Sequence, residues 1–197
     1  MAFDDTAPPK EGENCPFCEI SAAHAPFSPR SPPPTLPSTL TAPESFVVLS
    51  TPTLVAFLDI MPLSPGHLLV CPRAHRPKLT SSTARESARL GAALRVLSEA
   101  LARATGVRDW NVVQNNGAAA AQVVPHLHFH VIPRPEIRAS GRFSESFTMF
   151  GRGVRGELDE EEAAGLAARL REEVRAVMVG DEGDGVDDDF AVDMAKL

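Results

Sequence analysis

Pro125-His126-Leu127-His128-Phe129-His130-Val131-Ile132 is the stretch that decides the fold of this chain and points to its chemistry. Side chains along a β-strand alternate between its two faces, so a strand here places the three histidines together and the apolar residues between them on the opposite face. The apolar face suits packing under a helix. Three of the six histidines of the chain would then share one short strand face, which indicates a site with a chemical task.

Three explanations of this histidine face compete. Hydrogen-bonded core histidines are the plainest, but three such groups are costly to bury. A metal ion held by all three is disfavoured, because strand residues two apart are separated by roughly 6.6 Å and a zinc–nitrogen bond is only about 2.1 Å long. Two neighbours could still share a metal. An array for phosphoryl or nucleotidyl transfer is favoured, because imidazole, with its usual pKa of roughly 6.5, is both a nucleophile and a proton donor near neutral pH.

The surrounding segments predict an α+β fold with a mainly antiparallel five-stranded sheet. The expected strands cover residues 46–49, 53–58, 67–71, 110–115 and 126–132. Apolar residues at three- and four-residue steps predict a long helix over about 82–105, packed on the sheet and closed by Gly106. A C-terminal helix is expected at about 158–177, where Asp159 and Glu162 form a weak capping box.

Composition divides the rest of the chain. Residues 1–14 are expected to be a flexible N-terminus, 15–137 the domain, and 138–179 a C-terminal extension that carries the second helix. Seven prolines within residues 26–43 predict an extended or mobile insertion, either a plain linker or a ligand for a protein partner. Residues 180–197 are expected to be an acidic disordered tail, because like charges repel and little there can be buried.

Charge and cysteine usage limit the possible partners and location. A net charge of −7 and a pI near 5.4 argue against a nucleic-acid binder, which needs a basic face. No apolar stretch is long enough to cross a membrane, and an acidic start is unlike a secretory signal, so a cytoplasmic or nuclear rather than secreted protein is expected. In such a compartment the Cys15-Pro-Phe-Cys18 clip reads as a metal site or redox pair rather than a disulfide framework.

Taken together, these motifs resemble the histidine-triad (HIT) superfamily, whose signature is His-φ-His-φ-His-φ-φ with φ apolar. The stretches Leu54 to Ile60 and Pro62 to His75 resemble the first half of the family pattern, and Asn115 to Gly117, Gln122 and the triad resemble the second. The resemblance runs from Cys15 to about Pro135. It implies a HIT-like fold, a homodimer in which two sheets join, and a nucleotide phosphohydrolase or nucleotidyl transferase. The implied substrates are purine nucleoside phosphoramidates or dinucleoside polyphosphates, which are attacked at the α-phosphate.

The resemblance also implies roles for single residues. His128 would attack the α-phosphorus to form a nucleotidyl-histidine, the backbone around His126 would orient it, and His130 would bind phosphate oxygens and assist proton transfer. Asp59 would accept hydrogen bonds from the ribose, and His67 would be structural. The other implied nucleotide-binding residues are Phe17, Ile20, Phe57 and Ile60 around the base, and Asn115 and Gln122 near the ribose and phosphates.

A subset of the family holds a structural zinc ion on a Cys-x-x-Cys clip and two histidines. The matching residues of this chain are Cys15, Cys18, His75 and His126. Two thiolates and two imidazoles make a closed tetrahedral set, the form expected of structural Zn²⁺. Free thiols or a redox pair remain the alternative.

The chain departs from the family pattern just before the triad. Where the family has Gly-Gln followed by Ser or Thr, this chain has Ala121-Gln122-Val123, and Val123 cannot give a phosphate the hydroxyl hydrogen bond. The run Ala118 to Ala121 also lacks glycines that let backbone approach a ligand. Slower turnover or a changed leaving group would follow. Two rivals stay open: a non-catalytic nucleotide-binding or adaptor protein, and a metal-centred hydrolase.

Overall fold

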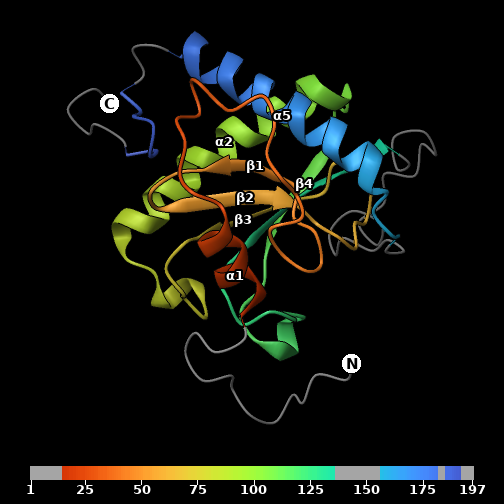
Figure 1. The fold of residues 1–197 in the computed structure, drawn as a ribbon. Coiled ribbons are helices and arrows are strands. Elements are labelled where there is room, and N and C mark those ends of the chain that lie inside the picture. The colour runs from red at the N-terminus through yellow and green to blue at the C-terminus, as the bar shows by residue number, and fades with distance from the viewer. Residues whose placement is uncertain (1–14, 136–155, 182–184, 192–197) are drawn as a thin grey trace.

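The computed structural model describes residues 15–135, 156–181 and 185–191 (Figure 1). A five-stranded antiparallel sheet has the strand order β1-β2-β3-β5-β4. Its strands are β1 (Val47–Ser50), β2 (Leu54–Leu58), β3 (Leu68–Pro72), β4 (Trp110–Gln114) and β5 (Phe129–Pro133). The predicted α+β class and sheet are confirmed, with strand bounds that differ by one to three residues from those expected.

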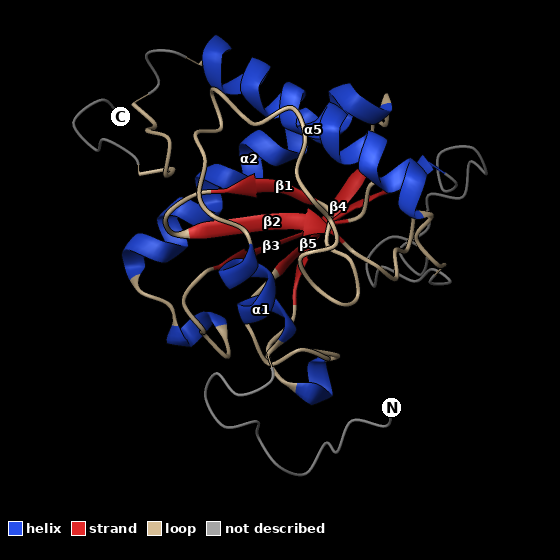
Figure 2. Ribbon diagram, viewed as in Figure 1, coloured by secondary structure: helices blue, strands red, loops and turns tan. Residues whose placement is uncertain are grey.

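Helices cover both faces of this sheet (Figure 2). The long helices α2 (Ala84–Thr105) and α5 (Glu160–Gly180) pack against each other and share the larger apolar cluster with one face of the sheet. The short helix α1 (Pro16–Ala23) lies on the opposite face, where Phe17 joins a smaller cluster with Val55 and Phe57. None of the helices in the described ranges is both long and apolar enough to cross a membrane.

Helix α2 begins and ends at well-formed caps. The Thr83 side chain accepts a hydrogen bond from the Glu86 backbone N–H, and the Glu86 carboxylate accepts one from the Thr83 N–H, which completes a capping box. Gly106 ends the helix in the left-handed region at φ 69°, where a residue without a Cβ is favoured. The predicted end at Gly106 is confirmed, and α5 extends three residues beyond its predicted end.

The strand that carries part of the histidine motif begins later than predicted. β5 starts at Phe129, so His126, Leu127 and His128 precede it. The later start has a local cause. The Leu127 N–H donates to the Arg76 carbonyl, in the chain that follows β3, so this N–H is not paired with a strand. The alternation of side chains survives, because Leu127 and Val131 are buried in the larger apolar cluster while His128 and His130 face away from it.

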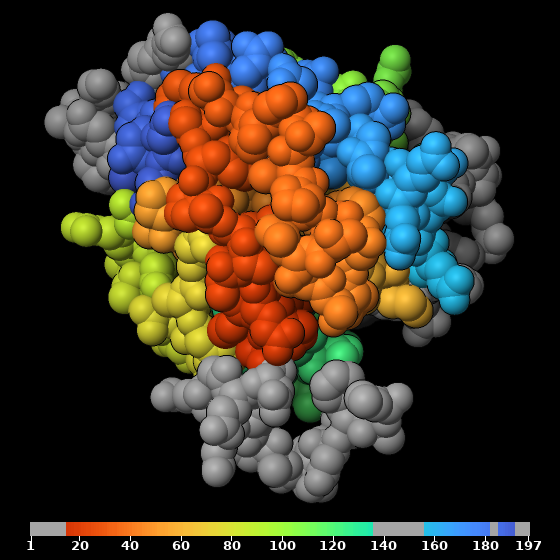
Figure 3. Space-filling model, in the orientation of Figure 1, coloured from red at the N-terminus to blue at the C-terminus, as the bar shows by residue number. Residues whose placement is uncertain are grey.

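The proline-rich insertion, residues 26–43, forms no helix or strand but is attached to the domain. The Phe27 N–H donates to the Ser50 carbonyl over 2.7 Å, and Leu36 packs against the smaller cluster. The buried Arg171 of α5 donates to the Pro34 carbonyl and to the Val47 carbonyl. Figure 3 shows this red-to-orange chain on the surface beside the blue of α5.

Part of the predicted disordered tail is packed, so that prediction is wrong for residues 185–191. Phe190 is fully buried in the larger cluster. The Asp189 carboxylate accepts hydrogen bonds from the Thr51 hydroxyl (2.7 Å) and the Thr53 backbone N–H (2.9 Å), and it pairs with Arg89 at 3.2 Å. These partners offset the acidic charge that had suggested disorder. The predicted N-terminus 1–14 and residues 136–155, 182–184 and 192–197 lie outside the described residues.

Candidate active site

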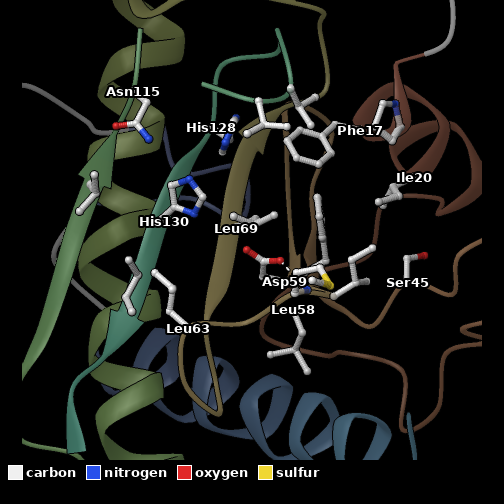
Figure 4. A pocket seen from close by; sticks show the side chains of 18 of the residues that line it. Phe17, Ile20, Ser45, Leu58, Asp59, Leu63, Leu69, Asn115, His128 and His130 are labelled. Carbon is white, nitrogen blue, oxygen red and sulfur yellow. Dashed lines mark hydrogen bonds between the residues drawn. The ribbon is translucent and has the colours of Figure 1, made fainter. Parts of the chain in front are cut away.

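A pocket of about 890 Å³ lies between α1, the ends of β2 and β5, and the loop that precedes the histidine motif. Figure 4 shows His128 and His130 on one side, with Phe17 and Ile20 of α1 facing them across the pocket. Most of its lining is apolar. The predicted nucleotide-binding residues that line it are Phe17, Ile20, Phe57, Asp59, Ile60, Asn115, His128 and His130.

His128 is oriented by the backbone of the same motif. Its Nδ1 lies 2.6 Å from the His126 carbonyl oxygen. A carbonyl can only accept, so Nδ1 carries the proton and donates it. In the neutral ring the lone pair is then on Nε2, which is the form of imidazole that can attack an electrophile. This geometry agrees with the predicted role of the backbone around His126, which is to orient the His128 ring.

His130 is oriented by His67. The Leu63 backbone N–H donates to His67 Nδ1 (3.2 Å), so the proton of a neutral His67 is on Nε2. That Nε2–H then donates to His130 Nδ1 over 2.9 Å. The proton of a neutral His130 is consequently on its own Nε2, available as a donor to a phosphate oxygen or a leaving group. The His128 and His130 rings lie 4.8 Å apart between centroids, so the two groups can act on one substrate atom.

The resemblance implied only a structural role for His67, and the contact of His67 with His130 was not predicted. The contact depends on β3 lying beside β5, with Leu68 opposite Val131. No spacing of residues in the sequence predicts that β3 pairs with β5. The only local signal is that His67 follows the Pro65-Gly66 turn, in which Gly66 has φ 86° and a Cβ would lie 3.1 Å from Leu101.

Gln122 is the one predicted nucleotide-binding residue that the structure does not bring to the pocket. Its Oε1 accepts from the Gly117 backbone N–H (2.6 Å), and its Nε2 donates to the Pro77 carbonyl (2.7 Å). The amide therefore closes the loop at Gly117 and attaches it to the chain that follows β3. The side chains of Ala120, Ala121, Val123 and Val124 line the pocket there instead.

Among the described lining residues, Glu44 and Ser45 are polar side chains that were not predicted. They lie directly after the proline-rich insertion, residues 26–43. The prolines of that insertion predicted an extended or mobile segment, so no feature of the sequence placed the residues that follow it near the base-binding side chains.

A second cluster lies beside the pocket and has the donor set of a metal site. The ligand atoms of Cys15, Cys18, His75 and His126 all lie within 4.8 Å of one another. Cys15 Sγ is 3.3 Å from His126 Nδ1, and Cys18 Sγ is 3.4 Å from His75 Nδ1. Ligands on one tetrahedral ion with ordinary Zn–S and Zn–N bonds would be about 3.6 Å apart. The four predicted metal ligands therefore come together at a fitting separation.

Hydrogen bonding and burial support the same interpretation. His126 Nε2 donates to the Pro72 carbonyl over 2.8 Å, which leaves Nδ1 unprotonated and directed at the thiols. Burial, followed by the neighbouring Cys15, raises the pKa of the Cys18 thiol to about 12. Burial likewise lowers the pKa of His126 to about 4. A divalent cation would stabilise the thiolate form that burial opposes, so this cluster could bind a metal ion.

A further trio, Asp59, His67 and His130, also has its ligand atoms within 4.8 Å. Its two imidazole nitrogens are only 2.9 Å apart, whereas two nitrogens on one tetrahedral ion would be separated by about 3.4 Å. A hydrogen bond accounts for the short distance. This trio is therefore an orienting chain, which weakens the case for a metal-centred hydrolase.

Comparisons with known proteins agree with this geometry. The family model of the HIT domain matches residues 41–137. An adenylylsulfatase of Arabidopsis thaliana is 42% identical over 82 residues, which cover 42% of this chain and 42% of the relative. An adenosine 5'-monophosphoramidase of Schizosaccharomyces pombe is 44% identical over 81 residues, 41% of this chain and 58% of the relative. The match thus spans only about half the length of these relatives.

Two further similarities bear on the family and the fold. An uncharacterised HIT-like protein of Methanocaldococcus jannaschii is 38% identical over 90 residues, 46% of this chain and 69% of that protein. Among solved structures, a zinc-bound histidine triad family protein from Mycobacterium smegmatis superposes with a TM-score of 0.58 at 27% identity, covering 85% of this chain and 97% of that one.

Proposed function

This chain belongs to the HIT family, and we propose that it is a nucleotide hydrolase or nucleotidyl transferase that acts at the α-phosphate of purine nucleoside phosphoramidates. The observation that carries the proposal is the orientation of His128, whose Nδ1 is held by the His126 carbonyl at 2.6 Å beside the His130 donor. Relatives described as an adenosine 5'-monophosphoramidase and an adenylylsulfatase support it.

The proposed reaction has two steps. The lone pair of His128 Nε2 attacks the α-phosphorus while the His130 Nε2–H donates a hydrogen bond to a phosphoryl oxygen, and the phosphorus–nitrogen bond breaks so that the substrate nitrogen, protonated by solvent, leaves as a neutral amine. A nucleotidyl-histidine results. Water then attacks the phosphorus, its proton returns to solvent, and the bond to His128 breaks. The products are an amine and a nucleoside monophosphate, and both histidines return to their starting forms.

The charge of the pocket favours an amine over a polyphosphate as the leaving group. The described part of its lining includes the carboxylates Glu44 and Asp59 but no lysine or arginine. A departing nucleoside polyphosphate would bring several negative charges that need cations nearby, whereas a protonated amine leaves uncharged or positive. Dinucleoside polyphosphates are therefore the second substrate class rather than the first.

We further propose that Cys15, Cys18, His75 and His126 hold one structural Zn²⁺. The bound ion would join α1 to the end of β3 and to the histidine motif, and would therefore fix the wall of the pocket. The spacing of the donors and the zinc-bound relative support this. Protein purified without chelator should contain about one zinc per chain, and Cys18→Ser should lower both the zinc content and the melting temperature. Unchanged zinc content in that variant would contradict the ligand assignment.

A homodimer is proposed through the outer edge of β4, which pairs with no further strand among the described residues. This strand ends the sheet, and its Trp110 and Val112 are 37% and 46% exposed. Unpaired strand edges with exposed apolar side chains are ready sites for strand pairing. Light scattering should give twice the chain mass, and Val112→Lys should shift it toward one chain mass.

Turnover of a small substrate panel tests the function. An adenosine 5'-phosphoramidate should be hydrolysed faster than diadenosine tri- or tetraphosphate, and His128→Ala should abolish turnover while nucleotide binding persists. If the unmodified protein binds nucleotides but turns over none of the panel, the non-catalytic adaptor function is correct instead.

A further inference from the structure

Glu44 brings a carboxylate to the end of the pocket that lies away from the histidines. It lines the pocket with Ser45, immediately before the chain enters β1. In Figure 4 Ser45 lies beyond Ile20 as seen from His130, with Asp59 and Phe17 in between. A nucleotide whose phosphate meets His128 and whose ribose meets Asp59 would therefore place its base toward Glu44.

The loop that carries Glu44 is closed by its own hydrogen bonds. The Ser45 backbone N–H donates to the Ser38 carbonyl over 3.0 Å. The Ser38 hydroxyl donates to Glu44 Oε2. The Thr41 hydroxyl lies 2.9 Å from the Ser45 hydroxyl. The Glu44 carboxylate is thus held by its neighbours before any ligand arrives, which lowers the entropy cost of using it for recognition.

Ser45 itself is poorly placed to recognise a base. Its hydroxyl is engaged by His24 Nε2 at 2.9 Å and by Thr41. The side chains that surround it in the pocket, including Ile20 and Phe57, are apolar. Among the described lining residues at this end, Glu44 is therefore the polar group that can distinguish one base from another.

A carboxylate only accepts hydrogen bonds, and its two oxygens can accept from two adjacent donors at once. The N1–H and 2-amino groups of guanine form such a pair. Adenine presents its 6-amino group beside the N1 lone pair, which a second carboxylate oxygen would repel. Hypoxanthine keeps N1–H but lacks the 2-amino group. A carboxylate in this position should therefore bind guanine more tightly than hypoxanthine, and hypoxanthine more tightly than adenine.

We propose that Glu44 is a specificity-determining residue that makes the pocket prefer guanine nucleotides to adenine nucleotides. The inference rests on the proposed nucleotide-binding function of the site and adds the class of base that the site selects. It does not depend on turnover, because the selection operates in binding.

Calorimetric titration of the full chain with GMP, IMP and AMP tests the proposal. GMP should bind about tenfold more tightly than AMP, with IMP between them, because charge-assisted hydrogen bonds at a partly exposed site give about that discrimination. Glu44→Gln should weaken GMP binding and reduce the GMP-to-AMP ratio to about threefold or less. Ser38→Ala should reduce the ratio by a smaller factor, because the carboxylate is kept but not held.

Glu172→Gln is the matched control, since it removes the same charge from an exposed position in the middle of α5. It should leave the ratio unchanged. Equal binding of GMP and AMP by the unmodified protein, or a preference that persists in Glu44→Gln, would overturn the assignment of Glu44 while nucleotide binding still stood. If none of the three nucleotides binds, the proposed function itself is wrong, and this inference is wrong with it.

Discussion

His67 Nε2 lies 2.9 Å from His130 Nδ1, and the far nitrogen of His67 accepts a hydrogen bond from the Leu63 backbone N–H. The chain of hydrogen bonds thus begins at a backbone group, which cannot change its donor role at ordinary pH. It specifies which nitrogen of each ring carries the proton. His130 therefore faces the pocket as a hydrogen-bond donor. His128 has the opposite role, because its Nδ1–H donates to the His126 carbonyl and leaves the Nε2 lone pair free to attack.

Replacing His67 should impair catalysis more than binding. His67→Leu removes the group that orients His130, so kcat on a nucleoside phosphoramidate should fall by about 100-fold with a small change in KM. Gln can both accept from Leu63 and donate to His130, so His67→Gln should recover most of the loss. Equal losses in the Leu and Gln variants would show that His67 acts only through packing.

Substitution of Val123 by a polar residue should raise the hydrolytic activity. It lines the pocket and is 66% exposed, so a smaller polar side chain fits without disturbing the core. Val123→Ser supplies a hydroxyl donor beside the phosphate and should increase kcat/KM on the order of tenfold. Val123→Ala is the control for size alone and should change kcat/KM by less than about twofold. An increase in the Ala variant equal to that in the Ser variant would attribute the gain to space.

Acid should destabilise the metal-free protein through His126. Burial lowers the pKa of His126 to about 4, below the unfolded value of roughly 6.5. The unfolded state therefore binds more protons between these values, and the free energy of unfolding falls as the pH falls through this window. In the presence of chelator, urea unfolding should show a loss of about 2 kcal/mol between pH 7 and pH 5. Burial also lowers the pKa of His24, which adds to the loss. His126→Gln should show a smaller dependence, and a wild-type stability that is constant over this range would contradict the account.

Phe190 should contribute to stability although it lies in an acidic C-terminal segment. Its side chain is fully buried in the larger cluster, and its backbone adopts φ 58°, an uncommon region for a non-glycine residue. Phe190→Ala should lower the free energy of unfolding by about 3 kcal/mol in urea. Val179→Ala, at an exposed position of α5, should cost less than about 0.5 kcal/mol. Similar small costs in both variants would mean that residues 185–191 do not dock in solution.

Local periodicity predicted the elements well, because the physical cause of each lies within its own sequence. The apolar spacing of α2 and its closing Gly106 belong to the helix itself, and so does the alternation that buries Leu127 and Val131. The start of β5 could not be predicted, because it depends on where the neighbouring strands end.

The parts of the site that the sequence missed depend on contacts between distant segments. His67, just before β3, contacts His130 of the neighbouring strand β5, and Glu44 lines the pocket directly after an insertion whose prolines suggested a linker. Gln122 was assigned to the nucleotide by resemblance, but its amide binds the Gly117 backbone N–H and the Pro77 carbonyl instead. The packing of Phe190 was hidden by the charge of its neighbours, whose partners, such as Arg89, lie far away in the chain.

Whether His128 attacks phosphorus can be tested by trapping the nucleotidyl-histidine. The protein is mixed rapidly with a nucleoside phosphoramidate and quenched in alkali, in which phosphorus–nitrogen bonds to histidine survive, and its peptides are sequenced by mass spectrometry. We expect one nucleotidyl group on His128 within the first turnover, and no adduct or turnover in His128→Ala. Turnover that persists in His128→Ala, or an adduct on His130 instead, would contradict it.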